Sequence, residues 1–399
     1  MTKIPSDFSL LQAKDLLDHH NQHTLFQYIH SCSSSDQTHF LEQLSALSKY
    51  LPNHYHPLNT SSPYDIKALK PLTSVYQQHP KEYALGEQSF KKNQVLSIIL
   101  AGGDGSRLGS MQPKGCFELS TPTKKSLFEL HCEKIVKLQN QISTEVPLII
   151  LTSNNNHSAT VAYFETHQFF GLSATQVSFI KQPQLPLYDE NNQWFLKSPT
   201  EICTGPNGNG AIFQTLRTYL QDLSHISYIL VINIDNALAN PCDINLVGSL
   251  INHKTDLALR CFEHTTSPHK VGILAYLNSN LSIIDYTDLP NNDSFPYGNI
   301  NTFCFDFSFF KALCHTDSLP IHWVKKTGTH YDPITKISKQ IPAWKGEYFI
   351  TDSVSLAKKV TPLNSTVEQH FAPLKKLDGI DGVQAVQNAL IKIRSFQPF

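Results

Sequence analysis

The sequence predicts an α/β protein built on a mostly parallel, mixed β-sheet, with a helical region before the sheet and a small lobe after it. Two observations support this prediction. Short apolar runs of strand length, rich in β-branched residues, recur along the middle of the chain, and amphipathic helical patterns lie between several of them. Strands that alternate with helices in this way are typical of a parallel sheet covered on both faces.

The N-terminal region, residues 1–93, is expected to be mainly helical. Apolar residues between positions 7 and 47 recur at helical spacing, in one stripe that ends at Ile29 and a second that begins at Phe40. The serine-rich segment at 33–36 predicts a loop that ends in capping residues. The prolines between positions 51 and 85 predict an irregular connector.

A central α/β domain is expected over residues 94–360. Its predicted strands are residues 95–100, 146–151, 177–180, 228–234, 257–262 and 271–277. Helical patterns separate several of them, including one from Ala211 to Leu223. Residues 361–399 are expected to form the small C-terminal lobe, and apolar residues from Val383 to Ile393 predict a helix there.

The composition excludes several classes of protein. Among 399 residues, 32 Lys and Arg balance 33 Asp and Glu, so no surface for nucleic acid is expected. The apolar runs are far shorter than the roughly 20 residues that cross a bilayer, and no signal peptide is expected. The eight cysteines show no C-x-x-C spacing, so we expect reduced thiols in the cytoplasm.

The most informative segment directly follows the first predicted strand. It reads L-A-G-G-D-G-S-R-L-G from position 100 and continues to Q-P-K-G at positions 112–115. Ligands of open α/β sheets bind beyond the carboxyl ends of strands. Glycines allow close backbone approach and leave N–H groups facing an anion, while Arg107 and Lys114 add two cations. The segment therefore predicts a phosphate-binding loop, and the alternative is a glycine-rich surface turn.

Two familiar nucleotide-binding motifs do not fit this loop. A P-loop requires a Lys followed by Ser or Thr after its glycines, and neither pair follows here. The dinucleotide motif requires G-x-G-x-x-G and an acidic residue about 20 positions later. Here Gly103, Gly105 and Gly109 have a different spacing, and Glu129 falls inside a helical pattern. Hydride transfer is therefore disfavoured.

The loop resembles the L-A-G-G-x-G-[TS]-R-L-G…P-K-G signature of the UDP-sugar pyrophosphorylases, within them the UDP-N-acetylhexosamine branch. These enzymes join UTP to a sugar 1-phosphate and release pyrophosphate. The resemblance implies a Rossmann-like nucleotidyltransferase fold, a Mg²⁺ (or Mn²⁺) cofactor and a cytoplasmic monomer or weak homo-oligomer. It also implies that Arg107 and Lys114 are catalytic. Ala101, Gly102 and Gly103 would bind the nucleotide.

Three further segments resemble nucleotide-binding motifs of this family. The turn at 205–210, G-P-N-G-N-G, is similar to P-D-G-N-G, which implies that Gly208 contacts the nucleotide and Asn209 the sugar. Gln182, just after the third predicted strand, matches a glutamine implied in uracil recognition, and an amide can both donate to and accept from uracil. Asp235 closes the fourth predicted strand and matches an aspartate implied to face the nucleotide and hold the divalent cation.

The resemblance also implies residues that bind the sugar and its phosphate. Gly272 and Asp285 lie in segments similar to the V-G-V and E-Y pair of a hairpin that walls the sugar pocket. Asn299 lies in a segment similar to G-N-I-x-N, whose first Asn meets the sugar. Lys345 begins K-G-E-Y-F-I-T-D, similar to K-x-E-x-F-x-x-D, whose Lys is implied to be catalytic and to reach the phosphates. Turn chemistry or a solvated surface is the alternative for these residues.

Three positions depart from the family pattern. Asp104 stands where Gln is usual, and its carboxylate must pair with Arg107, reach a metal or point away from a triphosphate. Asn207 replaces an Asp, and Lys181 replaces a Gln. These departures concern the selectivity for base and sugar more than the reaction type.

The sequence therefore favours the formation of UDP-N-acetylglucosamine from UTP and N-acetylglucosamine 1-phosphate, by Mg-assisted in-line attack on the α-phosphorus. The first alternative is the same reaction on glucose 1-phosphate, or on several sugar phosphates. The G-x-N-G turn disfavours it, because glucose-specific relatives typically show a P-P-G-H-G turn. The second alternative is a non-catalytic nucleotide-sugar sensor, and the retained cations Arg107, Lys114 and Lys345 argue against it.

Overall fold

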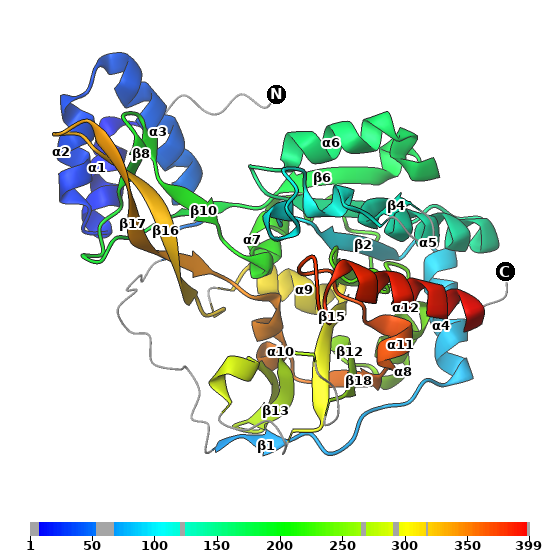
Figure 1. Ribbon diagram of the computed structural model, residues 1–399. Helices are drawn as coiled ribbons and strands as arrows, with labels where there is room; N and C mark the ends of the chain where they lie inside the picture. The colour runs from blue at the N-terminus through cyan, green and yellow to red at the C-terminus, as the bar shows by residue number, and fades with distance from the viewer. Residues whose placement is uncertain are drawn as a thin grey trace. The chain divides into compact units, whose positions relative to one another are not determined.

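The structure, a computed structural model, describes residues 8–52, 68–119, 124–264, 269–289, 295–316 and 318–396 (Figure 1). The contacts within the chain divide it into two compact units, each of which is discontinuous in sequence. Unit 1 comprises residues 1–63, 183–214 and 317–349, and unit 2 comprises residues 64–182, 215–316 and 350–399.

The N-terminal helices of unit 1 confirm the predicted helical region, with two differences. The helices are α1 (Leu10–His19), α2 (His23–Ser31) and α3 (Ser34–Ser48). The first apolar stripe is split between two helices, because Asn21 takes a left-handed conformation with a φ of 58°. The loop predicted at 33–36 was wrong, because α3 already begins at Ser34. Ser33 is the N-cap of this helix, and its hydroxyl accepts the N–H of Asp36 at 3.2 Å.

Unit 1 also contains two small sheets. The strands, in chain order, are β7 (Gln184–Pro186), β8 (Leu196–Ser198), β9 (Glu201–Ile202), β10 (Thr204–Pro206), β16 (His322–Asp332) and β17 (Ile337–Glu347). β7 pairs with β10, and the other four form a sheet in the order β17-β16-β8-β9. The buried amide of Gln22 connects the helices to the segment that precedes β8, because its Oε1 accepts the N–H of Trp194 at 2.7 Å.

Unit 2 is built around a ten-stranded mixed sheet. Its strands are β1 (Lys70–Pro71), β2 (Val95–Leu100), β5 (Leu148–Thr152), β6 (Val177–Lys181), β11 (Tyr228–Asn233), β12 (Leu257–Glu263), β13 (Ile273–Leu277), β14 (Asn280–Ile284), β15 (Tyr297–Asp306) and β18 (Val360–Asn364). All six predicted strands are confirmed. β11, β2, β5 and β6 are parallel neighbours, whereas β15 runs antiparallel to β11 and joins them to the rest of the sheet.

Helices cover this sheet and bury its apolar side chains. They are α4 (Pro80–Lys91), α5 (Leu127–Ile142), α6 (His157–Thr166), α8 (Ile244–His253), α9 (Phe307–Cys314), α10 (Ser353–Leu356), α11 (Val367–His370) and α12 (Val383–Phe396). A short hairpin, β3 (Glu118–Leu119) and β4 (Lys125–Ser126), precedes α5. The helix predicted in the C-terminal lobe is α12. None of the described helices is long and apolar enough to cross a lipid bilayer.

Two predicted boundaries were wrong. The irregular connector ends before α4, which begins with Pro80 at its first position and a capping box between His79 and Glu82. Residues 53–67 of the connector lie outside the described residues. The helix predicted over 211–223 is only α7 (Ile212–Leu216) followed by a 3-10 turn, Arg217–Tyr219, because Thr and Tyr are weak helix formers.

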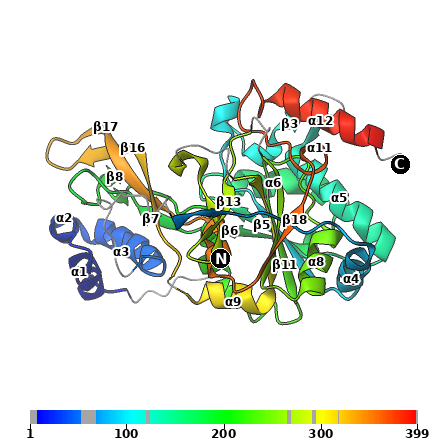
Figure 2. The same cartoon turned by 90° about the horizontal axis from the view of Figure 1, so that it is seen from below.

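Helices α4 and α8 lie side by side in unit 2 (Figure 2) and approach each other through glycines. A Cβ added at Gly86 would lie 2.0 Å from the carbonyl oxygen of Ile244, and one added at Gly248 would lie 1.7 Å from that of Glu82. Both distances are far below van der Waals contact with backbone atoms that cannot move independently. The contact between these helices therefore requires glycine at both positions.

We expect Gly86→Val to lower the free energy of unfolding of unit 2 by about 3 kcal/mol, since two packed backbones would have to separate. The midpoint of urea unfolding, followed by far-UV circular dichroism, measures this effect. Ala84→Val adds similar volume on the exposed side of the same helix and serves as the control, with a change within about 0.5 kcal/mol. Equal midpoints for the two variants would show that the helices do not depend on the glycine contact.

Candidate active site

The predicted nucleotide-binding residues of unit 2 gather at the carboxyl ends of its parallel strands. β2 and β11 pair in register, so that Leu100 lies opposite Asn233 and the segments that follow leave the same edge of the sheet. β5 and β6 continue the parallel block on the other side of β2. Asp235, the glycine-rich loop and Gln182 therefore lie at one edge, as expected of a ligand site in an α/β sheet.

The glycine-rich loop folds back on the segment that carries Lys114. The N–H of Gly105 donates to the carbonyl of Gln112 at 3.2 Å, and the N–H of Lys114 donates to that of Gly103 at 3.3 Å. A Cβ at Gly105 would lie 2.5 Å from the Gln112 oxygen, and Gly109 has a φ of 64°. The loop conformation therefore requires glycine at both positions.

Asn156, which the sequence analysis did not identify, holds the backbone of the glycine-rich loop in place. Its side-chain Nδ2 donates to the carbonyls of Ala101 at 2.9 Å and Gly103 at 3.2 Å, and its Oδ1 accepts the N–H of Ser153 at 2.8 Å. These bonds draw the loop carbonyls toward the buried amide. A possible sequence signal was the run S-N-N-N directly after strand β5.

Gln182 and Gly102 are in direct contact. The Gln182 side chain is only 8% exposed, and its backbone N–H donates to the carbonyl of Thr152 at 2.7 Å. A Cβ at Gly102 would lie 2.7 Å from Gln182 Nε2, so a larger residue would require the amide to shift. The structure thus brings together the residue predicted to recognise uracil and another residue predicted to bind the nucleotide.

Lys114 and Asp235 form a loose ion pair at the same edge, with Nζ and Oδ2 separated by 3.7 Å. Their side chains are 16% and 24% exposed, so both can be reached by a ligand. Arg107 and Asp104 are exposed, and no ion pair joins them in this described part of the chain. Asp104 therefore does not neutralise the arginine.

The residues predicted to bind the sugar also meet in unit 2. β13 and β14 form the expected hairpin, and its last pair, Ile273 and Ile284, places Gly272 and Asp285 at one end. The N–H of Asn299 donates to the carbonyl of Gly272 at 2.8 Å. The Asn299 side chain is buried and its Nδ2 donates to Asn301 Oδ1 at 2.7 Å.

The predicted turn at 205–210 has a conformation that requires glycine and packs on the segment after Lys345, within unit 1. Gly208 has a φ of 87°, and a Cβ there would lie 2.3 Å from the carbonyl oxygen of Tyr348. That oxygen accepts the N–H of Gly210 at 2.8 Å, while the N–H of Tyr348 donates to the carbonyl of Asn207 at 2.8 Å. Asn209, the first residue of the following 3-10 turn, is held next to this contact.

Lys345 lies against the same turn. A Cβ at Gly205 would be 3.1 Å from Lys345 Cε, and Lys345 Nζ pairs with Glu347 Oε1 at 2.7 Å. The lysine side chain is mostly buried, and Glu347, which the sequence analysis did not select, orients its ammonium group. Unit 1 therefore brings together Gly208, Asn209 and Lys345, and the remaining predicted residues belong to unit 2.

Asp235 is the predicted metal ligand, and its surroundings fit Mg²⁺ bound together with phosphates. Among the described residues, no group of three or more His, Cys, Asp and Glu side chains could hold a metal ion alone. Mg²⁺ usually takes one or two carboxylates and completes its shell with water and phosphate oxygens. A single accessible carboxylate beside a glycine-rich loop offers this kind of site.

Comparison with known proteins assigns the family. Residues 38–354 match the family described as UTP–glucose-1-phosphate uridylyltransferase. UDP-N-acetylglucosamine pyrophosphorylase of Saccharomyces cerevisiae is 28% identical over 364 residues, which are 82% of this chain and 76% of the yeast protein. The crystal structure of the Trypanosoma brucei uridine diphosphate N-acetylglucosamine pyrophosphorylase has a TM-score of 0.81 at 22% identity, over 97% and 85% of the two chains.

A UDP-glucose phosphorylase from Trypanosoma brucei has the same fold but is less similar, with a TM-score of 0.66 at 17% identity over 92% of this chain and 77% of that chain. The match to the family spans most of the sequence. It includes the glycine-rich loop, Gln182, Asp235 and Lys345. The chain belongs to the UTP–glucose-1-phosphate uridylyltransferase family.

Proposed function

We propose that this protein forms UDP-N-acetylglucosamine and pyrophosphate from UTP and N-acetylglucosamine 1-phosphate. The observation that carries the proposal is the glycine-rich loop placed beside Lys114 and Asp235 at the edge of a parallel sheet. The preference for N-acetylglucosamine is supported by the yeast relative named for that sugar, which is similar over most of both chains. The UDP-glucose enzyme shares the fold at lower identity.

In this reaction an oxygen of the sugar 1-phosphate attacks the α-phosphorus of UTP. A new O–P bond forms as the bond from the α-phosphorus to the bridging oxygen breaks, and pyrophosphate leaves with that electron pair. No general base is required, because the attacking phosphate is already ionised. Both substrates are polyanions, so the protein contributes mainly by positioning them and by stabilising negative charge.

The residues of the glycine-rich edge suit these tasks. Backbone N–H groups of the loop and the cations Arg107 and Lys114 would neutralise the β- and γ-phosphates and the leaving pyrophosphate. Gln182 would bind the uracil edge through its amide. Asp235 would hold Mg²⁺, which when bound supplies positive charge to the phosphate oxygens.

The remaining proposed roles concern the sugar and its phosphate. Gly272, Asp285 and Asn299, which lie together at the end of the β13–β14 hairpin, would wall the sugar pocket. Asn209 would contact the sugar. Lys345 would bind a phosphate, and its ion pair with Glu347 supports this role because it fixes the direction of a long, flexible side chain.

We expect pyrophosphate release when the protein is incubated with UTP, Mg²⁺ and N-acetylglucosamine 1-phosphate. Parallel reactions with N-acetylgalactosamine 1-phosphate and glucose 1-phosphate test the selectivity, and kcat/KM should be highest for N-acetylglucosamine 1-phosphate. A higher value for glucose 1-phosphate would replace the proposed substrate. Binding of UDP-sugars without turnover of any sugar phosphate would instead identify a sensor.

Arg107→Ala should lower kcat by about 100-fold or more, because a cation that stabilises the transferring phosphates is removed. The arginine is exposed, so the midpoint of thermal unfolding should change little. Steady-state pyrophosphate release and differential scanning calorimetry measure the two effects. The same removal of charge in Lys81→Ala, at an exposed position of α4, is the control. An unchanged kcat in Arg107→Ala would remove this residue from the mechanism.

Asn156→Ala should weaken the binding of UTP by about tenfold, since the carbonyls of Ala101 and Gly103 lose a buried donor worth about 1–3 kcal/mol. Calorimetric titration with UTP measures the affinity. The neighbouring Asn154 is exposed, and Asn154→Ala should bind UTP like the unmodified protein. Equal affinities in both variants would show that the loop holds its conformation without Asn156.

A further inference from the structure

A cavity of about 560 Å³ lies in unit 2, and none of the predicted site residues lines it. Its walls come from α5, β12, the segment that follows Asp235 and the chain before Phe371. The charged and titratable side chains of the lining are Tyr83, Lys134, Lys137, Cys242, Asp243, Arg260 and His370. The volume is within the range of pockets that hold small organic ligands.

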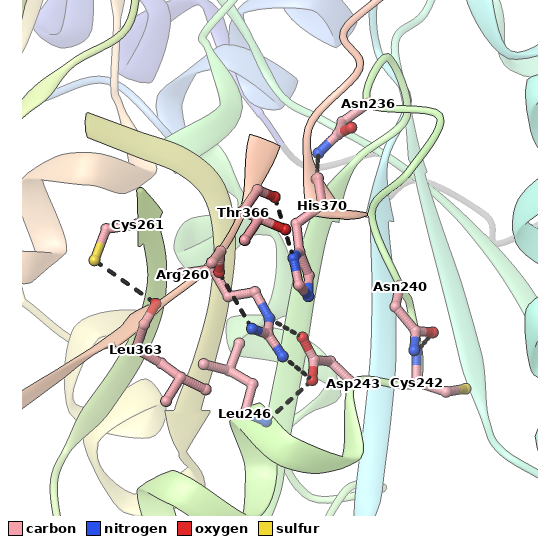
Figure 3. A network of polar contacts seen from close by, with 11 residues as sticks. Asn236, Asn240, Cys242, Asp243, Leu246, Arg260, Cys261, Leu363, Thr366 and His370 are labelled. Carbon is pink, nitrogen blue, oxygen red and sulfur yellow. Dashed lines mark hydrogen bonds and ion pairs between the residues drawn. The ribbon is translucent and has the colours of Figure 1, made fainter. Parts of the chain in front are cut away.

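The carboxylate in this lining is already neutralised. The Nε and Nη2 atoms of Arg260 both donate to Asp243, the second at 2.8 Å, and both side chains are buried (Figure 3). Asp243 also accepts the N–H of Leu246 and so caps α8. Although burial opposes ionisation, the charge of Arg260 holds the pKa of Asp243 below its usual value. This pair adds no net charge to the cavity.

The two lysines have no such partner. Lys134 Nζ donates to the carbonyls of Ala237 at 2.8 Å and Ala239 at 2.6 Å. Within the part of the chain that the structure describes, neither Lys134 nor Lys137 forms an ion pair, and burial lowers the pKa of Lys134 to about 7. A cation removed from water is normally paired with an anion. Lys134 has no anionic partner among the described residues, whereas Lys137, three residues later on α5, is exposed to solvent and places a second cation at the same cavity.

The walls of the cavity also hold the segment that carries Asp235. Asn236 Nδ2 donates to the carbonyl of His370 at 2.8 Å, and the N–H of Leu374 donates to the carbonyl of Asp235 at 2.8 Å. In Figure 3 the side chains of Arg260, Asp243 and His370 lie together below the contact between Asn236 and His370. Lys134, on α5, bonds to the carbonyls of Ala237 and Ala239 in the segment that follows Asp235. A ligand near Lys134 would therefore act on the backbone next to Asp235.

We propose that this cavity binds a small organic phosphate through Lys134 and Lys137, and that the bound anion holds the Asp235 segment more firmly. The phosphate would supply the missing counter-charge, and the charged form of Lys134 makes stronger bonds to the carbonyls of Ala237 and Ala239 than the neutral form. The apolar lining, which includes Leu138, Leu238 and Ile393, would contact the rest of the ligand. The effect on catalysis rests on the proposed function, whereas the binding does not.

The site is tested by calorimetric titration of the whole protein with glucose 6-phosphate and, in a separate arm, with inorganic phosphate. We expect Lys137→Gln to weaken the binding of glucose 6-phosphate by about tenfold, because a charge-assisted bond is lost. Lys134→Met should weaken it as well. Lys92→Gln, which removes an exposed lysine at the end of α4, is the matched control and should bind normally.

Arg107→Ala removes the main cation of the glycine-rich loop and should also leave this binding intact. Three results would overturn the proposal: no binding to the unmodified protein, equal affinity in Lys137→Gln, or loss of binding in Arg107→Ala. The last would place the anion in the glycine-rich loop. Tighter binding of glucose 6-phosphate than of inorganic phosphate identifies an organic phosphate as the ligand, and the reverse order overturns that choice.

The link to catalysis has its own readout. Saturating glucose 6-phosphate should raise kcat for N-acetylglucosamine 1-phosphate in the unmodified protein, and the increase should disappear in Lys137→Gln. Binding with an unchanged kcat would overturn the coupling to Asp235. Absence of turnover with every sugar phosphate would contradict the proposed function, while the titrations would still decide whether the cavity binds phosphate.

Discussion

The parallel pairing of β2 with β11 is the constraint on which the site in unit 2 depends. Because Leu100 and Asn233 lie opposite each other, the glycine-rich loop and Asp235 leave the sheet at the same edge. Backbone hydrogen bonds between two buried strands fix this relation, so it does not rely on the flexible side chains themselves. Lys114 can then approach Asp235 although they are 121 positions apart in the sequence.

Side chains from other parts of unit 2 also hold the two segments at this edge in place through hydrogen bonds. The buried amide of Asn156 holds two carbonyls of the glycine-rich loop. On the other segment, Lys134 donates to the carbonyls of Ala237 and Ala239, and the Asn236 side chain donates to the carbonyl of His370. Buried backbone carbonyls need hydrogen-bond donors, and here the donors come from helices and loops far away in sequence. The chain near His370 is therefore part of the support of the site.

The departures from the family pattern fall at positions with different consequences. Asp104 and Lys181 are exposed, so water screens their charges and neither is forced against a bound phosphate. Asn207 is fully buried, and its Nδ2 donates to Gln214 Oε1 at 3.1 Å. A carboxylate at that position would need a buried positive partner, whereas the neutral amide does not. Asn207 Oδ1, however, has no hydrogen-bond partner among the described residues, so unit 1 satisfies only the donor side of this amide.

The sequence by itself determined six of the ten strands of the unit 2 sheet, the glycine-rich loop and the types of residue that hold phosphates. Periodicity and glycine spacing are local properties, and they led to Arg107 and Lys114 without any structure, while the resemblance to the family motif implied Asp235. It did not reveal the end of the connector at Pro80 or the shortness of α7, because capping and helix propensity compete there with the apolar pattern. Only the tertiary structure identified Asn156 as the support of the loop, Glu347 as the partner of Lys345 and the cavity beside Lys134. These features depend on hydrogen bonds, ion pairs and packed side chains that exist only after the chain has folded, and no local pattern encodes them.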